Sequence, residues 1–456
     1  MLPDAVARYI RSNRDKLLSQ LCELLRIRSI SNDASQDDQC TRAAEWLARC
    51  AEAVGMRAEI VPTAGKPAVI AAAEAGPDSP TLLVYCHYDV QPPDPLEEWS
   101  SPPFEPTVRD GRLYARGACD DKGPLMAYLM AVEAWQQAGR RLPVNVKFFI
   151  EGEEEIGSPN VEAFVLEHRE KLRADAVVVP DTSFFASDVP SVTYGLRGLA
   201  YFEVTMTGAL RDVHSGLYGG AVGNPVHALA ALVAAMHDAD GRLTLEGFYD
   251  DVLEITDEER RAWAKLPFDE ADYAAAAGVG RLSGGERGFS VLERLWARPS
   301  ADCNGIVGGY VGPGAKTIIP SRASAKISMR LVPNQDPQKI VASFRKFVAG
   351  RTPAGMKSSV AVHATSRPVL ARTDSPVIRA ACRAIEEAFG GAAALIRCGA
   401  SVPATECIQR ILGVDVAIMG VTLPENNHHA PNENYSLDML TRSAVAAAAL
   451  FNNLRE

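Results

Sequence analysis

The stretch Thr81-Leu-Leu-Val-Tyr-Cys86-His87-Tyr-Asp89 indicates both the fold of this chain and the place of its chemistry. Its first six residues form a short continuous apolar run, which is typical of a strand covered on both faces. Similar runs follow at 144–150, 176–179 and 415–419, with helical patterns between them. Strands that alternate with helices predict an α/β domain with a mainly parallel sheet flanked by helices.

The pattern changes near residue 200. Residues 200–207 and 323–332 alternate in a two-residue period, as half-exposed strands do. A helical pattern at 225–237 and a long charged stretch at 244–300 lie between them. These residues predict an antiparallel α+β domain inserted into the α/β domain.

The predicted domain boundaries follow from this change of pattern. The first part of the α/β domain spans 1–198, the inserted domain spans 199–368, and the second part of the α/β domain spans 369–456. A length of 456 residues alone suggests two or three domains of about 150 residues. The patterning therefore favours two domains, of which one is interrupted by the other.

The composition is that of an ordinary globular protein and excludes several classes. Hydrophobic residues make up 47% and charged residues 23% of the chain. A net charge of −10 argues against a general nucleic-acid or anionic-membrane binder. Nine scattered cysteines without a CxxC pair suit reduced thiols, and no signal-type or membrane-spanning apolar run occurs. We therefore expect a cytoplasmic protein.

Candidate metal-binding residues follow the apolar runs. His87 and Asp89 are two residues apart, so in an extended chain their side chains point to one face. This spacing suits a metal-binding histidine whose second ring nitrogen is held by a carboxylate, although a His–Asp pair at the surface has the same spacing. Asp120 and Asp121, in the glycine-flanked segment 117–123, fit an ordinary turn or a carboxylate offered to a cation.

Further acidic and histidine residues follow the other runs. Glu153 to Glu155 stand in a row after the run at 144–150, Asp181 follows the run at 176–179, and the doublet His428-His429 comes after the last run. Neighbouring carboxylates raise one another's pKa, and this costs more at the end of a buried strand than on a solvated helix. Since chemistry in α/β sheets gathers at the carboxyl ends of strands, this joint placement predicts a metal site.

The residue types indicate which metal the site holds. Imidazoles and carboxylates without thiolates suit zinc, manganese or cobalt rather than magnesium or calcium. Two histidines and three carboxylates are too many for one tetrahedral ion, whereas a carboxylate shared by two ions about 3.5–4 Å apart would use them all. A spare glutamate beside a ligand glutamate is then a natural general base for a metal-bound water.

Three motifs carry a resemblance to a known family: His87-Tyr-Asp-Val-Gln-Pro, Arg116-Gly-Ala-Cys-Asp-Asp-Lys-Gly and Glu154-Glu155-Ile-Gly-Ser. Along nearly its whole length the chain resembles the dinuclear-metal peptidase family of carnosinase, cytosolic nonspecific dipeptidase, aminoacylase, succinyl-diaminopimelate desuccinylase and glutamate carboxypeptidase. The resemblance implies a zinc-peptidase-like catalytic domain with an inserted lid and dimerisation domain. It implies a peptidase that releases a C-terminal amino acid from dipeptides or short peptides. The alternative is an N-acyl-amino-acid deacylase with the same dinuclear site.

The resemblance also implies roles in the catalytic domain. Each subunit would hold two divalent ions, with zinc as the first candidate and manganese or cobalt as alternatives. Five side chains would bind them: His87, Asp120, Glu155, Asp181 and His429. Asp120 would bridge the ions, and its peptide bond to Asp121 is expected to be cis. Glu154 would be the general base, and Asp89 would orient the first histidine. Because two histidines stand side by side at 428–429, the choice of His429 over His428 as the ligand stays slightly open. The aspartate at 181, where other members of the family have glutamate, favours the dipeptidase branch.

In the inserted domain, the segment from Arg211 to Gly220 is similar to a motif of carnosinase-like dipeptidases. The resemblance implies a homodimer in which His214 reaches the active site of the other subunit and stabilises the oxyanion. Substrate would be bound by Asn224, Thr317, Arg330 and Ser401, with the threonine and the arginine on its terminal carboxylate. A rival from another class is a metal-binding module without catalysis, against which the intact Glu154–Glu155 pair argues.

Overall fold

The computed structural model describes residues 1–455, which form two compact units. Unit 1 contains Met1–Tyr194, Ala371–Ile396 and the chain from Val402 onwards, and unit 2 contains Gly195–Leu370 and Arg397–Ser401. The domain boundaries predicted from the sequence, after residues 198 and 368, stay a prediction. One short segment, Arg397–Ser401, groups with unit 2 although the sequence pattern assigns it to the other domain, because it is hydrogen-bonded to Arg197 and Arg330.

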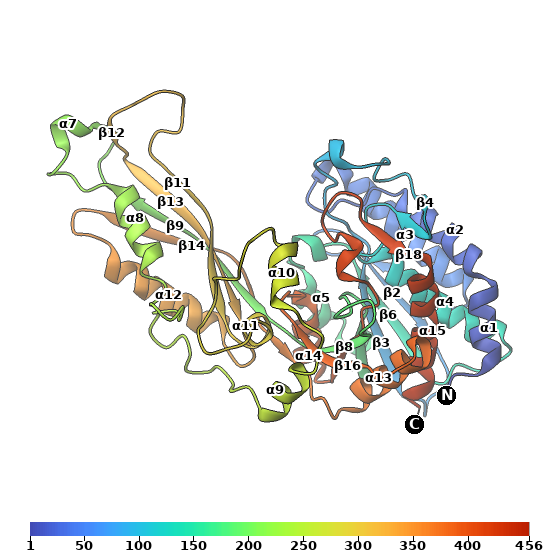
Figure 1. Cartoon of the computed structure of the whole chain (residues 1–456). Helices are drawn as coiled ribbons and strands as arrows, with labels where there is room; N and C mark the ends of the chain where they lie inside the picture. Colours follow the sequence, from blue (N-terminus) through green and yellow to red (C-terminus); the bar gives the residue numbers. More distant parts are fainter. Residues whose placement is uncertain (456) are drawn as a thin grey trace. The chain divides into compact units, whose positions relative to one another are not determined.

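Eight strands of a nine-stranded sheet lie wholly or mainly in unit 1 and form its centre (Figure 1), while the ninth, Val369–Leu370, belongs to unit 2. The strands lie in the order β1-β2-β6-β3-β7-β17-β8-β15, with β16 paired to β8. Their bounds are, in chain order, β1 Arg57–Val61, β2 Ala68–Ala73, β3 Thr81–His87, β6 Asn145–Glu151, β7 Ala176–Val179, β8 Ser191–Leu196, β15 Val369–Leu370, β16 Ala394–Cys398 and β17 Val416–Ile418.

The four inner strands β6, β3, β7 and β17 run parallel, whereas β1, β2, β8 and β15 pair with their neighbours antiparallel. The predicted α/β fold is confirmed, and the sheet as a whole is mixed. In the parallel part, His87 at the end of β3 is in register with Glu151 at the end of β6. The loops that follow these strands therefore leave the same edge of the sheet, where the predicted site residues lie.

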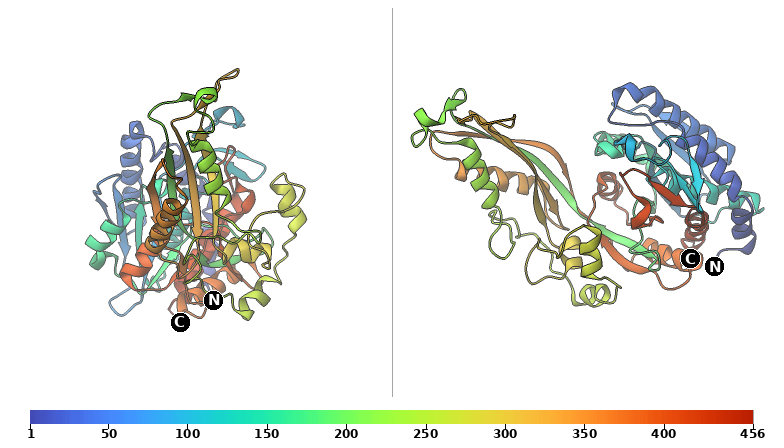
Figure 2. Two further views of the ribbon diagram at one scale, coloured as in Figure 1. Left: turned by 90° about the vertical axis from the view of Figure 1, so that its left-hand side faces the viewer. Right: turned by 45° about the horizontal axis from the view of Figure 1, so that its top comes forward.

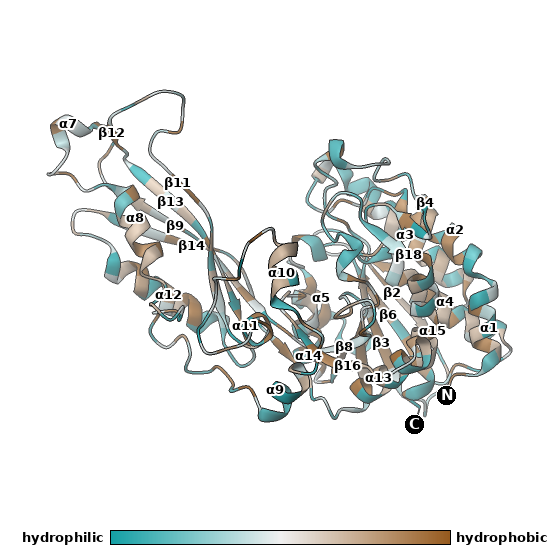
Figure 3. Cartoon of the chain, in the orientation of Figure 1, coloured by the Kyte–Doolittle hydropathy of each residue, from teal (hydrophilic) through white to brown (hydrophobic). Residues whose placement is uncertain are grey.

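Helices flank this sheet, and their sequences explain which faces they bury. Helix α4 is buried at every residue from Lys122 to Trp135, because its sequence is apolar on nearly all sides. Figure 3 shows the apolar residues of β2, β3 and β6 in the interior between the helices. The helices of this unit are α1 Asp4–Ser12, α2 Arg14–Leu25, α3 Asp37–Ala53, α4 Lys122–Gln137, α5 Val161–Glu167, α6 Arg169–Leu172, α13 Pro376–Phe389, α14 Pro403–Leu412 and α15 Leu437–Asn453.

Smaller elements complete unit 1. A three-stranded sheet in the order β18-β5-β4 joins the chain near residue 110 to the C-terminal region. Its strands are β4 Thr107–Arg109, β5 Arg112–Tyr114 and β18 Asn434–Ser436, and the 3₁₀ turns are η1 Ala34–Gln36, η2 Leu96–Glu98, η3 Glu154–Ile156 and η4 Pro424–Asn426.

Unit 2 is built on a four-stranded antiparallel sheet in the order β11-β13-β9-β14, as its two-residue patterning predicts. The strands are β9 Gly198–Thr207, β11 Ser300–Gly308, β13 Arg322–Leu331 and β14 Lys357–Ser366. Helices α8 Pro225–Ala234 and α12 Pro337–Arg351 cover one face of this sheet (Figure 2), where Phe202 and Phe344 lie in the core.

The charged stretch at 244–300 also folds, although its sequence pattern does not indicate how. It contains the short helices α9 Asp257–Trp263, α10 Glu270–Ala276 and α11 Val291–Trp296. Its buried Glu286 accepts hydrogen bonds from Arg298 at 2.7 and 3.0 Å, and apolar side chains such as Phe248 and Trp263 are buried in the same stretch. Elsewhere in unit 2, β10 Val213–His214 pairs with β12 Ile318–Ile319 in a two-stranded sheet, and helix α7 Ser215–Tyr218 directly follows β10.

In the described part of the chain, no helix combines the length and the apolar character needed to cross a membrane.

Candidate metal centre

Five loops at one edge of the unit 1 sheet carry the predicted metal-binding side chains. His87 ends β3, and Asp181 follows two residues after β7. Asp120 precedes helix α4, and its peptide bond to Asp121 is cis, as the family resemblance implies. Glu155 lies in the 3₁₀ turn η3 after β6, and His429 follows η4. Parallel strands and the loops after them thus bring together residues far apart in the sequence.

These side chains form two triads that share Asp120. In the first, His87 Nε2 lies 3.1 Å from Asp120 Oδ1 and 3.8 Å from Asp181 Oδ2. In the second, His429 Nε2 lies 2.9 Å from Asp120 Oδ2 and 3.1 Å from Glu155 Oε2. Within each triad the ligand atoms all lie within 4.8 Å of one another. The two oxygens of Asp120 therefore face different triads, as a bridging carboxylate requires.

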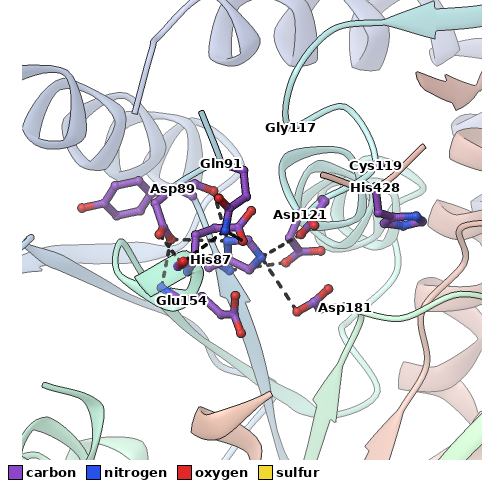
Figure 4. Close-up of polar contacts among 12 residues, drawn as sticks. His87, Asp89, Gln91, Gly117, Cys119, Asp121, Glu154, Asp181 and His428 are labelled. Carbon is purple, nitrogen blue, oxygen red and sulfur yellow. Dashed lines mark hydrogen bonds and ion pairs between the residues drawn. The ribbon is translucent and has the colours of Figure 1, made fainter. Parts of the chain in front are cut away.

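Asp89 connects the first triad to the turn that carries the paired glutamates (Figure 4). Its carboxylate lies 3.3 Å from His87 Nδ1, on the side of the ring away from Asp120. The same carboxylate accepts the backbone N–H groups of Glu154 at 3.2 Å and of Glu155 at 3.1 Å. Asp89 is completely buried, so it holds both the imidazole and the η3 turn in place.

The carboxyl groups of the site are crowded in a buried place. Burial, followed by the negative charges of Asp181, Glu155 and Asp120, holds the pKa of Glu154 well above its usual range despite the imidazole of His87. Burial and the charge of Asp120 raise the pKa of Asp181 to about 7. Burial alone would also raise the pKa of Asp120, but hydrogen bonds from His429 and His87 keep it well below its usual value. The site therefore has an excess of negative charge that cations would neutralise.

The donor set fits divalent metal ions. Each triad offers an imidazole nitrogen and two carboxylate oxygens at converging positions, without a thiolate. Nitrogen and oxygen donors of this kind are typical of zinc, manganese and cobalt sites. Two triads that share one carboxylate suit a pair of ions. The same dications would offset the repulsion among these carboxylates.

The histidine doublet divides its tasks. His429 belongs to the second triad, with φ of 57° turning the chain so that its ring reaches Asp120. His428 instead contacts Thr422 Oγ1 at 3.1 Å, and Figure 4 shows its ring turned away from His87. Of the two candidates that the sequence leaves open, His429 is the one whose side chain lies in a triad.

Sequence reasoning missed a buried carboxylate that holds the site together. Glu433 is fully buried and receives the guanidinium of Arg116 at 2.8 Å. It also accepts the backbone N–H groups of Gly117 at 2.8 Å, Cys119 at 2.9 Å and Asp120 at 3.3 Å. The segment with the bridging aspartate is thus tied to the segment that follows His429. Only the acid in Ala430-Pro-Asn-Glu433 signals this role in the sequence.

Asp121 and Gln91 also support the site, a role that the sequence pattern assigned to neither. Asp121 is fully buried and accepts the backbone N–H of His87 at 3.3 Å, and burial raises its pKa well above the usual value. Gln91 donates to Glu155 Oε2 at 3.0 Å and so orients a side chain of the second triad. Metal sites commonly depend on such supporting hydrogen bonds.

The predicted residues of unit 2 fall into two groups. His214 is exposed on β10, is paired with Ile318, and lies next to Thr317, whose carbonyl accepts the N–H of Ser215. Arg330, near the end of β13, donates to Ser401 Oγ at 3.0 Å.

Asn224, the remaining predicted residue of unit 2, lies at the start of a helix. Its side chain accepts the N–H of Val226 at 2.9 Å and caps helix α8. An N-cap of this kind satisfies a helix donor that would otherwise be unpaired. Its predicted contact with substrate remains a prediction.

Comparisons with known proteins agree with this geometry. A model of Peptidase family M20/M25/M40 matches residues 83–453. The chain is 33% identical to human Beta-Ala-His dipeptidase, over 80% of its own length and 73% of that protein. It is 30% identical to the Cys-Gly metallodipeptidase dug1 of Schizosaccharomyces pombe, over 95% of its own length and 94% of that protein. The solved metallo-carboxypeptidase Sso-CP2 from Sulfolobus solfataricus is 34% identical, with a TM-score of 0.89 over 96% of this chain and 99% of that one. The resemblance predicted from the motifs is confirmed, and the chain belongs to Peptidase family M20/M25/M40.

Proposed function

We propose that this chain is a metal-dependent dipeptidase, which hydrolyses dipeptides or short peptides and releases the C-terminal amino acid. The observation that carries the proposal is the pair of triads that share Asp120, with the partly buried Glu154 beside them. The names of relatives support it, since two are metallo- or Beta-Ala-His dipeptidases and a third is a metallo-carboxypeptidase.

His87, Asp120 and Asp181 would hold one divalent ion, and Asp120, Glu155 and His429 a second. The donor set favours zinc, with manganese or cobalt as alternatives. Such ions, when bound, polarise the scissile carbonyl and make water easier to deprotonate.

Glu154 is proposed as the general base and then the general acid. Its carboxylate takes a proton from the attacking water as the oxygen bonds to the peptide carbonyl carbon. When the C–N bond breaks, the Glu154 carboxyl group gives this proton to the leaving amine, and the two products are a carboxylate and a free amino acid. Asp89 supports both steps, because it holds the Glu154 backbone and the His87 ring with the same carboxylate.

The two groups of substrate-binding residues in unit 2 support a homodimer. His214 and Thr317 precede β13, while Arg330 lies near its far end. At about 3.3 Å per residue, the strand from Arg322 to Arg330 is about 26 Å long. An extended dipeptide is only about 7 Å long, so it cannot contact both groups of one chain. We propose that His214, as an oxyanion-stabilising residue, and Thr317 act in the site of the partner subunit.

Exposed apolar side chains support the same assembly. Four large apolar side chains are exposed in the segments of unit 2 near α7 and from the end of β11 to β12. They are Leu210, Leu217, Val307 and Val311, with exposed fractions of 107, 78, 69 and 89%. A cluster of this kind is costly on a monomer and typical of a protein–protein interface.

A mixing experiment tests the shared site. The variants His214→Ala and Glu154→Ala should each be inactive as homodimers. After random mixing, half of the dimers are mixed, and each of these has one site with both residues intact. We therefore expect recovery to about one quarter of wild-type activity. Mixed dimers isolated with two affinity tags that recover nothing would contradict the trans arrangement.

A substrate panel tests the proposed activity against its alternatives. Alanyl-alanine, N-acetylalanine and N-succinylalanine are assayed with the zinc-, manganese- or cobalt-loaded protein, before and after treatment with a chelator. Hydrolysis of the dipeptide that is lost with the metal and returns on its readdition supports a dipeptidase. Preference for the acyl amino acids would instead indicate the N-acyl-amino-acid deacylase, and metal binding without any hydrolysis would indicate a non-catalytic module.

A further inference from the structure

We propose that Arg197 is a further substrate-binding residue, which acts with Arg330 as a pair of guanidinium groups on the C-terminal carboxylate of the substrate. This inference rests on the proposed function, and it goes beyond it by assigning a second cation to carboxylate recognition. All residues involved belong to unit 2.

Four segments meet around these two side chains. Arg197 directly precedes β9, Ser300 begins β11, Arg330 is in register with both Ser300 and Leu199, and the segment 397–401 lies against them. Arg197 Nε donates to the carbonyl of Gly399 at 2.9 Å, and its Nη1 donates to Ser300 Oγ at 3.3 Å. The guanidinium is thus held by neutral groups at two of its nitrogens.

Ser401 links the two arginines. Its hydroxyl accepts the hydrogen bond from Arg330 Nη1 at 3.0 Å and donates to the carbonyl of Arg197 at 2.6 Å. The hydroxyl is therefore already engaged as both acceptor and donor, and it positions Arg330 relative to Arg197. We infer that Ser401, which the resemblance assigns to substrate binding, acts mainly through this arginine.

Neither guanidinium has a carboxylate partner. Within residues 1–455, neither Arg197 nor Arg330 forms a salt bridge, although both side chains are partly buried. The two arginines of this unit that are buried are each paired with a glutamate: Arg298 with Glu286 and Arg397 with Glu259. Two neighbouring cations without an anion are costly in a partly buried place, and this cost falls when an anion binds.

The electrostatics of the pair agree with close proximity. Burial, followed by the positive charge of Arg330, lowers the pKa of Arg197 to about 10. Burial also lowers the pKa of Arg330. Asp302 on β11 is the carboxylate whose charge reaches both, but it is exposed and forms no salt bridge with either. The positive charge of the pair is therefore left largely uncompensated.

The backbone at Gly399 packs closely against the side chain of Arg197. A Cβ at Gly399 would lie 3.0 Å from Arg197 Nη2 and 3.1 Å from the carbonyl of Leu295, so only glycine fits here without a shift. Arg397, two residues earlier, is paired with Glu259 and lies over the ring of Trp263 at 5.4 Å. The stretch 244–300, whose sequence shows no motif, thereby supports the segment that presents Ser401 and contacts Arg197.

The ligand chemistry follows from the planar shape of guanidinium. Arginine binds carboxylates through two parallel N–H groups, with a charge and a geometry that an amide cannot match. Two arginines on one carboxylate should therefore make the enzyme discriminate strongly between a free C-terminal carboxylate and its amide.

The variant Arg197→Lys tests this role, because lysine keeps the charge and loses the planar fork. We expect KM for alanyl-alanine to rise about 10- to 100-fold, the range for one charge-assisted hydrogen-bonded contact, with a smaller change in kcat. Hydrolysis of alanyl-alaninamide should change little, so the preference for the free carboxylate should shrink by the same factor. Arg330→Lys should behave alike, and the exposed Arg322→Lys on the same strand serves as the control.

The contrary outcomes are separable. If Arg197 only holds Gly399, the variant loses kcat equally on alanyl-alanine and alanyl-alaninamide, and the preference for the carboxylate stays at its wild-type value. That result overturns the inference and leaves the proposed function standing. A metal-loaded wild type that hydrolyses neither compound overturns the proposed function. In that case, binding of alanine against alaninamide, measured by calorimetry in wild type and Arg197→Lys, still decides whether Arg197 recognises a carboxylate.

Discussion

Replacement of Glu154 by alanine is expected to lower kcat by about 10²- to 10⁴-fold, the usual contribution of a positioned general acid–base group. The physical reason is that the proposed mechanism assigns the carboxylates of both triads to the metal ions, so none of them would be free to accept and return the proton of the water. Metal content should stay at the wild-type value, because Glu154 belongs to neither triad.

Two measurements check this expectation together. Steady-state kinetics on alanyl-alanine give kcat, and elemental analysis of the same sample gives the metal content. Glu167→Ala, an exposed glutamate at the end of α5, should match wild type in both. Turnover that survives in Glu154→Ala would refute the proposed mechanism, whereas loss of metal would move Glu154 among the ligands.

Replacement of Asp120 by asparagine is expected to have a larger effect. Each triad loses a charged donor at the same time, since both oxygens of Asp120 face a histidine, at 3.1 and 2.9 Å. The two donors that remain in each triad should bind divalent ions weakly. Activity should therefore fall by about 10²- to 10⁴-fold or more, which is the loss expected for removal of the general base. Unlike Glu154→Ala, this variant should lose metal as well as turnover.

Metal analysis and thermal unfolding test the role of Asp120 without relying on activity. Ligands that bind only the folded state raise its stability, by about 2.7 kcal/mol at a concentration 100 times Kd. The chelator should therefore lower the Tm of wild type and leave the Tm of Asp120→Asn nearly unchanged. Asp78→Asn, at an exposed aspartate in the turn between β2 and β3, should behave like wild type. Two ions retained by Asp120→Asn would contradict a bridging role.

The strands of the parallel core could be predicted because their sequences are locally unambiguous. The run from Thr81 to Cys86 is apolar at nearly every position, which only a strand covered on both faces explains. The alternation in β9 and β13 likewise predicts strands with one buried face. The antiparallel outer strands that make the sheet mixed were not predicted, since strand direction depends on partners distant in the sequence.

The stretch at 244–300 and the segment 397–401 show where local patterns stop being informative. The first contains buried ion pairs such as Glu286–Arg298, whose members look like surface charges until tertiary contacts bury them. The second follows the pattern of unit 1 along the chain but groups with unit 2 through hydrogen bonds to Arg197 and Arg330.

The sequence by itself determined the α/β class, the inserted antiparallel unit, the family and the candidate ligands, because periodicity and short motifs are local properties of a chain. Only the tertiary structure decided that the two oxygens of Asp120 face different triads, that His429 rather than His428 joins them, and that Glu433 holds the Asp120 segment. It also decided that Arg197 and Arg330 share a place without a carboxylate between them. These are matters of distance between side chains from separate loops, and such distances are set by the packing of the whole chain.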